Sequence, residues 1–88
     1  MPDGQDPVAH IRHIDIPVAD LARWEAVANR LINVTPDVVT AISEMHADPC
    51  VHRIWRAANA ARYAAKIADE PLKAEAIALA EELEARAI

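Results

Sequence analysis

Five side chains of the kinds that bind zinc fall into two groups along this sequence. His10 and His13 are three positions apart, and His46, Cys50 and His52 lie within a stretch of seven positions. Structural zinc is held by about four nitrogen or sulfur ligands in a tetrahedral array. No C-x-x-C or H-E-x-x-H spacing fixes such an array here. We therefore expect no metal site and no cofactor, with Cys50 as a partly buried structural thiol.

A cysteine nucleophile is the enzymatic chemistry that these residues suggest most directly. Cys50 has His46 and His52 nearby and stands near the expected start of a helix, and a thiol beside a basic side chain is a recurrent nucleophile. Catalysis also requires a concave pocket with convergent polar groups. We do not expect such a pocket in so small a helical domain, and the one glycine, Gly4, provides no phosphate-binding loop. The sequence predicts a protein that is not an enzyme and has no catalytic residue.

Four segments with helical spacing of apolar residues position these side chains, and each segment opens with a proline. Proline fits the first turn of a helix because its missing N–H has no intrahelical partner there. Helices are predicted over residues 17–33, 36–47, 49–68 and 71–88, with Thr35, Asp48 and Asp69 as N-terminal caps. The predicted fold class is all-α, a small bundle of about four helices.

Residues 1–16 lack this helical pattern and are predicted to form an extended N-terminal arm, which leaves residues 17–88 as the helical domain. Ile14 and Ile16 alternate with His13 and Asp15, as in a short strand. A lone strand has no partner in a chain of four helices. The segment is therefore an arm lying on the helices, which we favour, or a strand completed by another subunit.

Helical spacing also predicts which side chains form the core. The inward positions are Val18, Leu21, Trp24, Ala28, Leu31 and Ile32 in the first helix; Val38, Ile42 and Met45 in the second; Val51, Ile54, Trp55, Ala58, Ala61 and Ala65 in the third; and Leu72, Ala76, Leu79, Leu83 and Ala87 in the fourth. Twenty alanines and no phenylalanine make this a small core. One core of this size supplies only ~3–5 kcal/mol, so an oligomer or a partner would add needed burial.

Charge and composition limit the setting and the partners. The net charge is −5, yet residues 48–68 carry four bases and one acid. An acidic chain disfavours nucleic acid and anionic membranes, and the apolar runs are too short to span a bilayer. A single cysteine fits a reducing compartment, and the acidic N-terminus does not look like a signal peptide, so we expect a cytoplasmic protein. Seven arginines against two lysines, with abundant alanine, indicate a GC-rich bacterial or phage genome.

The third predicted helix has a second face that is typical of a protein interface. Its members share one quadrant opposite the inward stripe, and they are His52, Arg56, Asn59, Tyr63 and Ile67. Arg and Tyr are enriched among residues that dominate binding energy. On the fourth helix, Ile77 lies off the leucine stripe and is added as a partner-binding residue. The predicted function is a non-enzymatic protein-binding module, namely a regulator, inhibitor or assembly factor, whose partner is a second copy or a foreign protein.

Two alternatives use the same residues. If the third helix were central, with both faces buried, the stripe would lie at the edge of the core. The functional alternative is a helix-turn-helix DNA-binding regulator formed by residues 36–66, with His52, Arg53 and Arg56 near the start of the recognition helix. The acidic chain and the absence of glycine from the turn count against DNA, and we do not expect nucleic acid as the partner.

Overall fold

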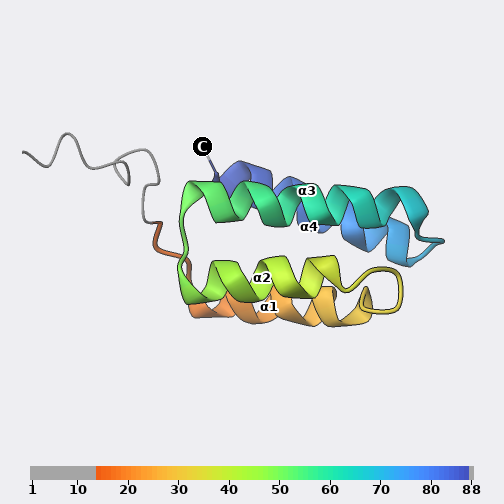
Figure 1. Cartoon of the computed structure of the whole chain (residues 1–88), viewed down its shortest axis with the longest axis horizontal. Coiled ribbons are helices and arrows are strands. Elements are labelled where there is room, and N and C mark those ends of the chain that lie inside the picture. The colour runs from red at the N-terminus through yellow and green to blue at the C-terminus, as the bar shows by residue number, and fades with distance from the viewer. Residues whose placement is uncertain (1–13, 88) are drawn as a thin grey trace, which may run out of the picture.

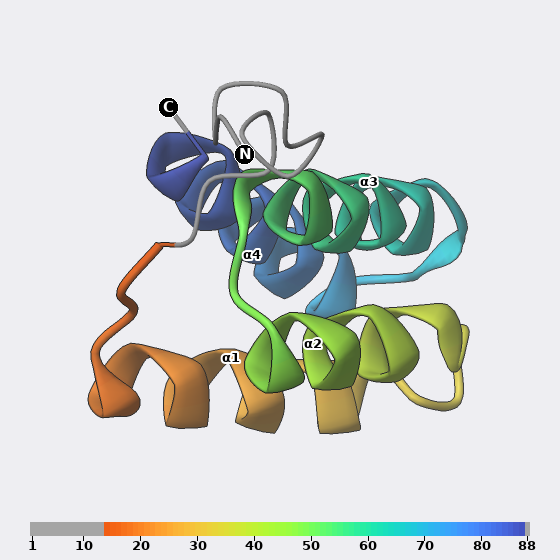
Figure 2. The same ribbon diagram turned by 60° about the vertical axis from the view of Figure 1, so that its left-hand side comes forward.

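The computed structural model describes residues 14–87 and shows four helices within that range (Figure 1). They are α1 (Val18–Arg30), α2 (Asp37–Ala47), α3 (Val51–Ile67) and α4 (Leu72–Arg86), and no strand occurs among the described residues. Successive helices run antiparallel, with α1 and α2 in one layer and α3 and α4 in the other (Figure 1, Figure 2). Each helix packs against two neighbours, and α4 closes the bundle on α1. The predicted all-α bundle is confirmed.

The described end of the predicted N-terminal arm touches the helices. Residues 14–17 run into α1 without forming a strand. The backbone N–H of Ile14 donates a hydrogen bond to the carbonyl oxygen of Pro49 at 3.0 Å. Ile14 and Ile16 are partly buried against the core. The rest of the predicted arm, residues 1–13, lies outside the described residues, as does Ile88.

The prolines stand where the sequence predicts helices to begin. Pro17, Pro36 and Pro71 immediately precede α1, α2 and α4, while α3 begins two residues after Pro49. The predicted cap of the second helix is present, because Thr35 Oγ1 accepts a hydrogen bond from the backbone N–H of Asp37, the first residue of α2, at 3.2 Å. Proline and a short hydroxyl side chain together fix this helix start.

Two predicted caps and one predicted helix end are wrong. The Asp48 carboxylate accepts a bond from Arg53 Nε at 3.4 Å instead of capping α3, whose cap position is Cys50. At α4 the cap is not Asp69, since Glu70 Oε1 accepts the Ala74 N–H at 3.1 Å. The first helix ends at Arg30, three residues earlier than predicted, because the chain then tightens into a turn over residues 31–34.

The two layers of the bundle contribute very different side chains to the core. The largest fully buried side chains are Trp24, Leu31, Ile42, Met45, Ile54, Leu83 and Val38. The buried face of α3 otherwise consists of alanine, namely Ala57, Ala58, Ala61, Ala64 and Ala65, and α4 meets it with Ala76, Leu79, Ala80 and Leu83. Methyl side chains let two backbones approach closely, and α3 and α4 form the most extensive helix pair of the bundle.

Three side chains predicted to face inward are exposed instead. Val18 is the first residue of α1, with no preceding turn to cover it. Ile32 follows the end of α1, so helical spacing no longer sets its direction. Trp55 is 42% exposed, because the alanine contacts between α3 and α4 leave no space for an indole between the helices. The prediction for these three positions was wrong.

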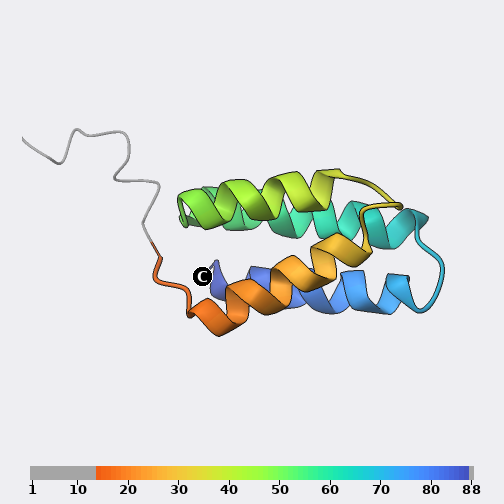
Figure 3. The same cartoon turned by 90° about the horizontal axis from the view of Figure 1, so that it is seen from below.

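An ion-pair cluster fixes α1, which crosses α4 obliquely (Figure 3). Trp24 is buried, and its Nε1 donates to Glu82 Oε1 at 3.1 Å. Arg23 pairs with the same Glu82 carboxylate and with Asp20 Oδ1, the second bond being 2.9 Å long. Arg86 of α4 reaches Asp20 Oδ2 at 2.5 Å, with its guanidinium 5.7 Å from the centre of the Trp24 ring. The cluster therefore joins polar side chains of both helices around the one buried indole.

The alanine packing predicts how the bundle responds to added volume. Ala61→Leu places three further carbons between α3 and α4, and overpacking of this kind costs typically 1–3 kcal/mol. We expect that loss in the free energy of unfolding measured with urea. Ala78→Leu, on the exposed side of α4, is the matched control and should stay within ~0.5 kcal/mol. Equal effects of the two substitutions would contradict close packing at Ala61.

The ion-pair cluster predicts a loss of stability in acid. Hydrogen bonds from Arg23 and Arg86 hold the pKa of Asp20 below its ordinary 3.8. Burial alone would raise the pKa of Glu82, but hydrogen bonds from Trp24 and Arg23 outweigh it and bring the pKa below 4.5. Folding lowers both pKa values. The two carboxylates therefore stabilise the fold at pH values above their pKa in the unfolded chain, and this stability is lost as the pH falls through their pKa in the folded protein.

We therefore expect the melting temperature to fall steadily from about pH 5 to about pH 3. An Asp20→Asn/Glu82→Gln variant should show a shallower pH dependence, since neither amide titrates. Glu81→Gln, an exposed neighbour outside the cluster, serves as control and should keep the slope of the unmodified protein. Parallel curves for all three proteins would show that the cluster does not couple folding to protonation.

Candidate functional site

The predicted partner-binding stripe lies on the outside of α3. His52, Arg56 and Asn59 are exposed, and Tyr63 and Ile67 have exposed fractions of 52% and 51%. The buried face of α3 points the opposite way, towards α4 and the core. The structure thus brings the five residues together on one surface and does not place them at the edge of the core. Ile77, the sixth predicted residue, is half-buried on α4.

Three further residues that were not predicted belong to this surface. Trp55 was predicted to lie in the core, and Arg62 and Lys66 were not assigned, but all three are exposed. Arg62 and Lys66 lie on the side of α3 nearer α4. We call the complete set the outer face of α3, and its members are His52, Trp55, Arg56, Asn59, Arg62, Tyr63, Lys66 and Ile67. It holds two of the three aromatic residues of the chain, Trp55 and Tyr63. The run of alanines on the opposite side of α3 could have indicated these residues. A helix face that packs closely through alanine has no room for a large side chain, so large side chains are expected elsewhere on the helix.

The outer face is basic, and both of its arginines contact acids of the same chain. α3 contains four bases and no acid. Arg62 makes two bonds to Glu84 of α4, from Nη2 at 2.7 Å and from Nε at 2.9 Å. This hydrogen bonding lowers the pKa of Glu84 and raises that of Arg62, so the pair stays ionised across the usual pH range. Arg56 lies 4.0 Å from Glu44 of α2, so each edge of the face carries one acid–base contact.

An open groove of about 410 Å³ runs along the α3–α4 edge of this face. Arg62, Ala65 and Lys66 line it from α3, and Lys73 and Ile77 line it from α4. The groove places Ile77 beside the outer face of α3. Its side chain is less exposed than its position off the leucine stripe suggests, because it also packs against the core. The chemistry of the groove is a small aliphatic floor bordered by cationic side chains.

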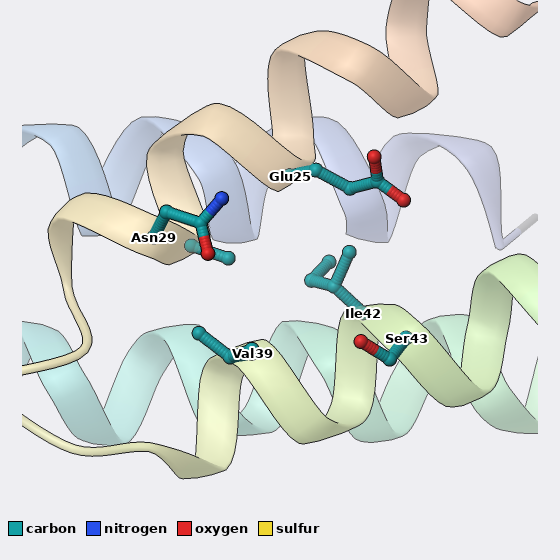
Figure 4. A pocket seen from close by; sticks show the side chains of 6 residues that line it. Glu25, Asn29, Val39, Ile42 and Ser43 are labelled. Atoms are coloured by element: carbon teal, nitrogen blue, oxygen red, sulfur yellow. The ribbon is translucent and has the colours of Figure 1, made fainter.

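Two smaller hollows lie elsewhere on the bundle. Glu25, Ala28, Asn29, Val39, Ile42 and Ser43 line one of about 120 Å³ between α1 and α2 (Figure 4). Next to it, His46 Nδ1 lies 2.5 Å from Glu25 Oε2 across the two helices. The other, about 220 Å³ in volume, lies between α2 and α3, and Glu44 and Arg56 are among its lining residues. Both are shallow and open to solvent, and neither gathers a set of convergent polar groups around an enclosed space.

The histidine and cysteine side chains take separate positions. Cys50 is buried, more fully than predicted, while His46 pairs with Glu25 and His52 is exposed. His10 and His13 lie outside the described residues. Within residues 14–87, no group of three or more His, Cys, Asp or Glu side chains is placed to hold a metal ion. Nor does this part of the chain contain a helix long and apolar enough to cross a membrane.

The geometry of α2 and α3 bears on the helix-turn-helix alternative. The two helices lie side by side and antiparallel (Figure 1, Figure 3). In helix-turn-helix motifs the two helices meet at about 90–120°, which lets the second enter the major groove. Arg53 and Arg56 also face acids of their own chain, Asp48 and Glu44. Both features differ from those of a recognition helix.

Comparison with known proteins gives no independent assignment. No family model, curated protein or solved structure matches this chain.

The exposure of the outer face predicts a clear difference between two aromatic substitutions. Tyr63→Ala should change the free energy of unfolding by no more than ~0.5 kcal/mol, because exposed substitutions have small effects. Trp24→Ala, which empties the core next to Glu82, should cost ~3–5 kcal/mol. Urea unfolding of both variants measures the contrast. A loss at Tyr63 comparable to that at Trp24 would mean that this face belongs to the core.

Proposed function

We propose that this protein is a non-enzymatic protein-binding module that contacts its partner through the outer face of α3. The observation that carries the proposal is the exposure of Trp55 and Tyr63 in a chain with so few large side chains. Full burial of a large apolar side chain is worth ~1.5–3 kcal/mol, which a core rich in alanine would benefit from. Both aromatic residues instead face outward on one helix, where a partner can cover them.

The composition of the face supports a protein as the partner. Trp, Tyr and Arg are the residues most enriched where truncation weakens an interface by ~2 kcal/mol or more. Trp55, Asn59 and Tyr63 follow one another at four-residue spacing, so they line up along the helix. Seventeen residues give α3 a length of about 25 Å, enough to pair with a helix or fill a groove on another protein.

The role of such a module is regulation, inhibition or assembly, because the fold offers a binding surface and the described residues form no enclosed site. We place it in the cytoplasm of a bacterium or phage host, on the strength of the single cysteine and of seven arginines against two lysines. DNA binding is not proposed, since the antiparallel arrangement of α2 and α3 does not favour it.

The test compares two variants that each remove a pair of exposed large apolar side chains. Trp55→Ala/Tyr63→Ala alters the outer face, and Val18→Ala/Ile32→Ala alters exposed residues outside α3. Each protein is immobilised, captured lysate proteins are identified, and dissociation constants are measured with the purified partner. Light scattering on each free protein shows whether the partner is a second copy.

We expect the first variant to bind at least ~30-fold more weakly, which corresponds to the loss of one residue worth ~2 kcal/mol. The second variant should bind as the unmodified protein does, and both should remain folded by circular dichroism. The proposal would be refuted if the outer-face variant bound the partner, or associated with itself, as tightly as the unmodified protein does.

A further inference from the structure

The two lysines of this chain border the same groove from different helices. Lys66 is in the last turn of α3 and Lys73 is in the first turn of α4, and both line the groove described above. Both are exposed, and neither makes an ion pair within the described residues. The two acids of the connecting loop leave them unpaired, since Glu70 bonds to the Ala74 backbone and Asp69 does not line the groove.

The third cation of the groove is already neutralised. Arg62 is held by Glu84 through two hydrogen bonds, so its charge faces a carboxylate of its own chain. The groove floor is aliphatic, formed by Ala65 and by Ile77, which is only half covered. The site therefore offers an apolar contact with two unpaired ammonium groups beside it.

A ligand that matches this site has an aliphatic side chain with carboxylates next to it. In an α-helix such groups come together at spacings of three and four residues. An acidic amphipathic helix provides them along one face, with Leu or Ile towards the groove and Asp or Glu towards the lysines. Opposite charges also speed association and discriminate against partners of the wrong sign.

The charge pattern disfavours a second copy of this chain in a symmetric arrangement. A two-fold interface brings the same surface of both copies together. Because α3 contains no acid, a dimer that paired α3 with α3 would place Lys66 of one copy on the basic α3 of the other. A polyanion such as nucleic acid is also disfavoured, because Arg53, Arg56 and Arg62 already have acidic neighbours and few cations are left for phosphate contacts.

We infer that the groove between α3 and α4 receives an acidic amphipathic helix of the partner protein, with its aliphatic side chain on Ala65 and Ile77 and its carboxylates on Lys66 and Lys73. This inference rests on the proposed function and names the chemistry of the partner. Trp55 and Tyr63 extend the contact along α3.

The probe is a phage-displayed library of sixteen-residue peptides, with helix-favouring residues at fixed positions and random residues at the others. The library is selected separately on the full chain, on Lys66→Glu/Lys73→Glu and on Trp55→Ala/Tyr63→Ala. Reversal at Lys66 opposes the dipole of α3 whereas reversal at Lys73 agrees with that of α4, so the fold should tolerate the pair. Circular dichroism checks this, and Lys66→Gln/Lys73→Gln replaces the reversed variant if its spectrum changes.

We expect the full chain to select peptides in which Asp or Glu lies three or four positions from Leu or Ile. The charge-reversed variant should select Lys or Arg at those positions, and peptides from the first selection should bind it at least tenfold more weakly. If peptides depend on Trp55 and Tyr63 but not on the lysines, the proposed function stands and this inference fails. If selection yields no peptide, or only peptides that bind all three proteins equally, both fail.

Two further measurements address the other occupants. Fluorescence anisotropy with single- and double-stranded 20-nucleotide DNA and RNA tests for a polyanion site. Binding at 150 mM salt that the charge reversal abolishes would overturn the inference. Light scattering over a range of concentrations tests for a second copy. Self-association that the charge reversal abolishes would also overturn it.

Discussion

The close packing of alanine between α3 and α4 is the constraint on which the rest of this structure depends. Methyl groups fill the buried side of α3 along its length, with Ile54 as the one large buried side chain of that helix. This face packs against the leucines and alanines of α4, and the other large side chains of α3 point outward or to an edge. The exposure of Trp55, Tyr63 and Ile67 is thus a consequence of how the helix packs.

The other layer of the bundle supplies the volume that alanine does not. Trp24 and Leu31, from α1 and the turn after it, and Ile42 and Met45 of α2 are almost fully buried. They pack against the buried sides of α3 and α4, where alanine is the most frequent residue. α1 has less contact with its neighbours than α3 has, and the hydrogen bond from the Trp24 indole to Glu82 gives the buried donor a partner where α1 meets α4.

The helices and most of the core could be predicted from sequence, because those features depend on local rules. Proline positions and the spacing of apolar residues locate all four helices, and Thr35 caps α2 as its side chain implies. Trp55 shows where such rules stop. Its spacing agrees with an inward position beside Ile54, but the distance between α3 and α4 decides which of the neighbouring positions is covered. Residues of both helices set that distance together, so it cannot be predicted from the apolar spacing of one helix.

The candidate surface could also be predicted from sequence only in part. Spacing alone places His52, Arg56, Asn59, Tyr63 and Ile67 on one side of a helix, and the structure finds them exposed there. The groove that joins Lys66 to Lys73 and Ile77 depends on how α3 and α4 lie against each other, which no single-helix pattern describes. The position of Ile77 off the leucine stripe suggested full exposure, but the side chain is half-buried because it also packs against the core.

The acidic residues at the edges of the outer face affect which partners would benefit from its positive charge. Glu44 and Glu84 approach Arg56 and Arg62 from opposite sides, and ion pairs this exposed contribute little to stability. A partner carboxylate can therefore replace one of them at small cost, while a partner without carboxylates leaves them in place. Lys66 and Lys73 have no such internal partner to give up. Carboxylates of the proposed partner would gain a new contact at that end of the face without breaking an old one, in addition to the apolar contact at Trp55 and Tyr63.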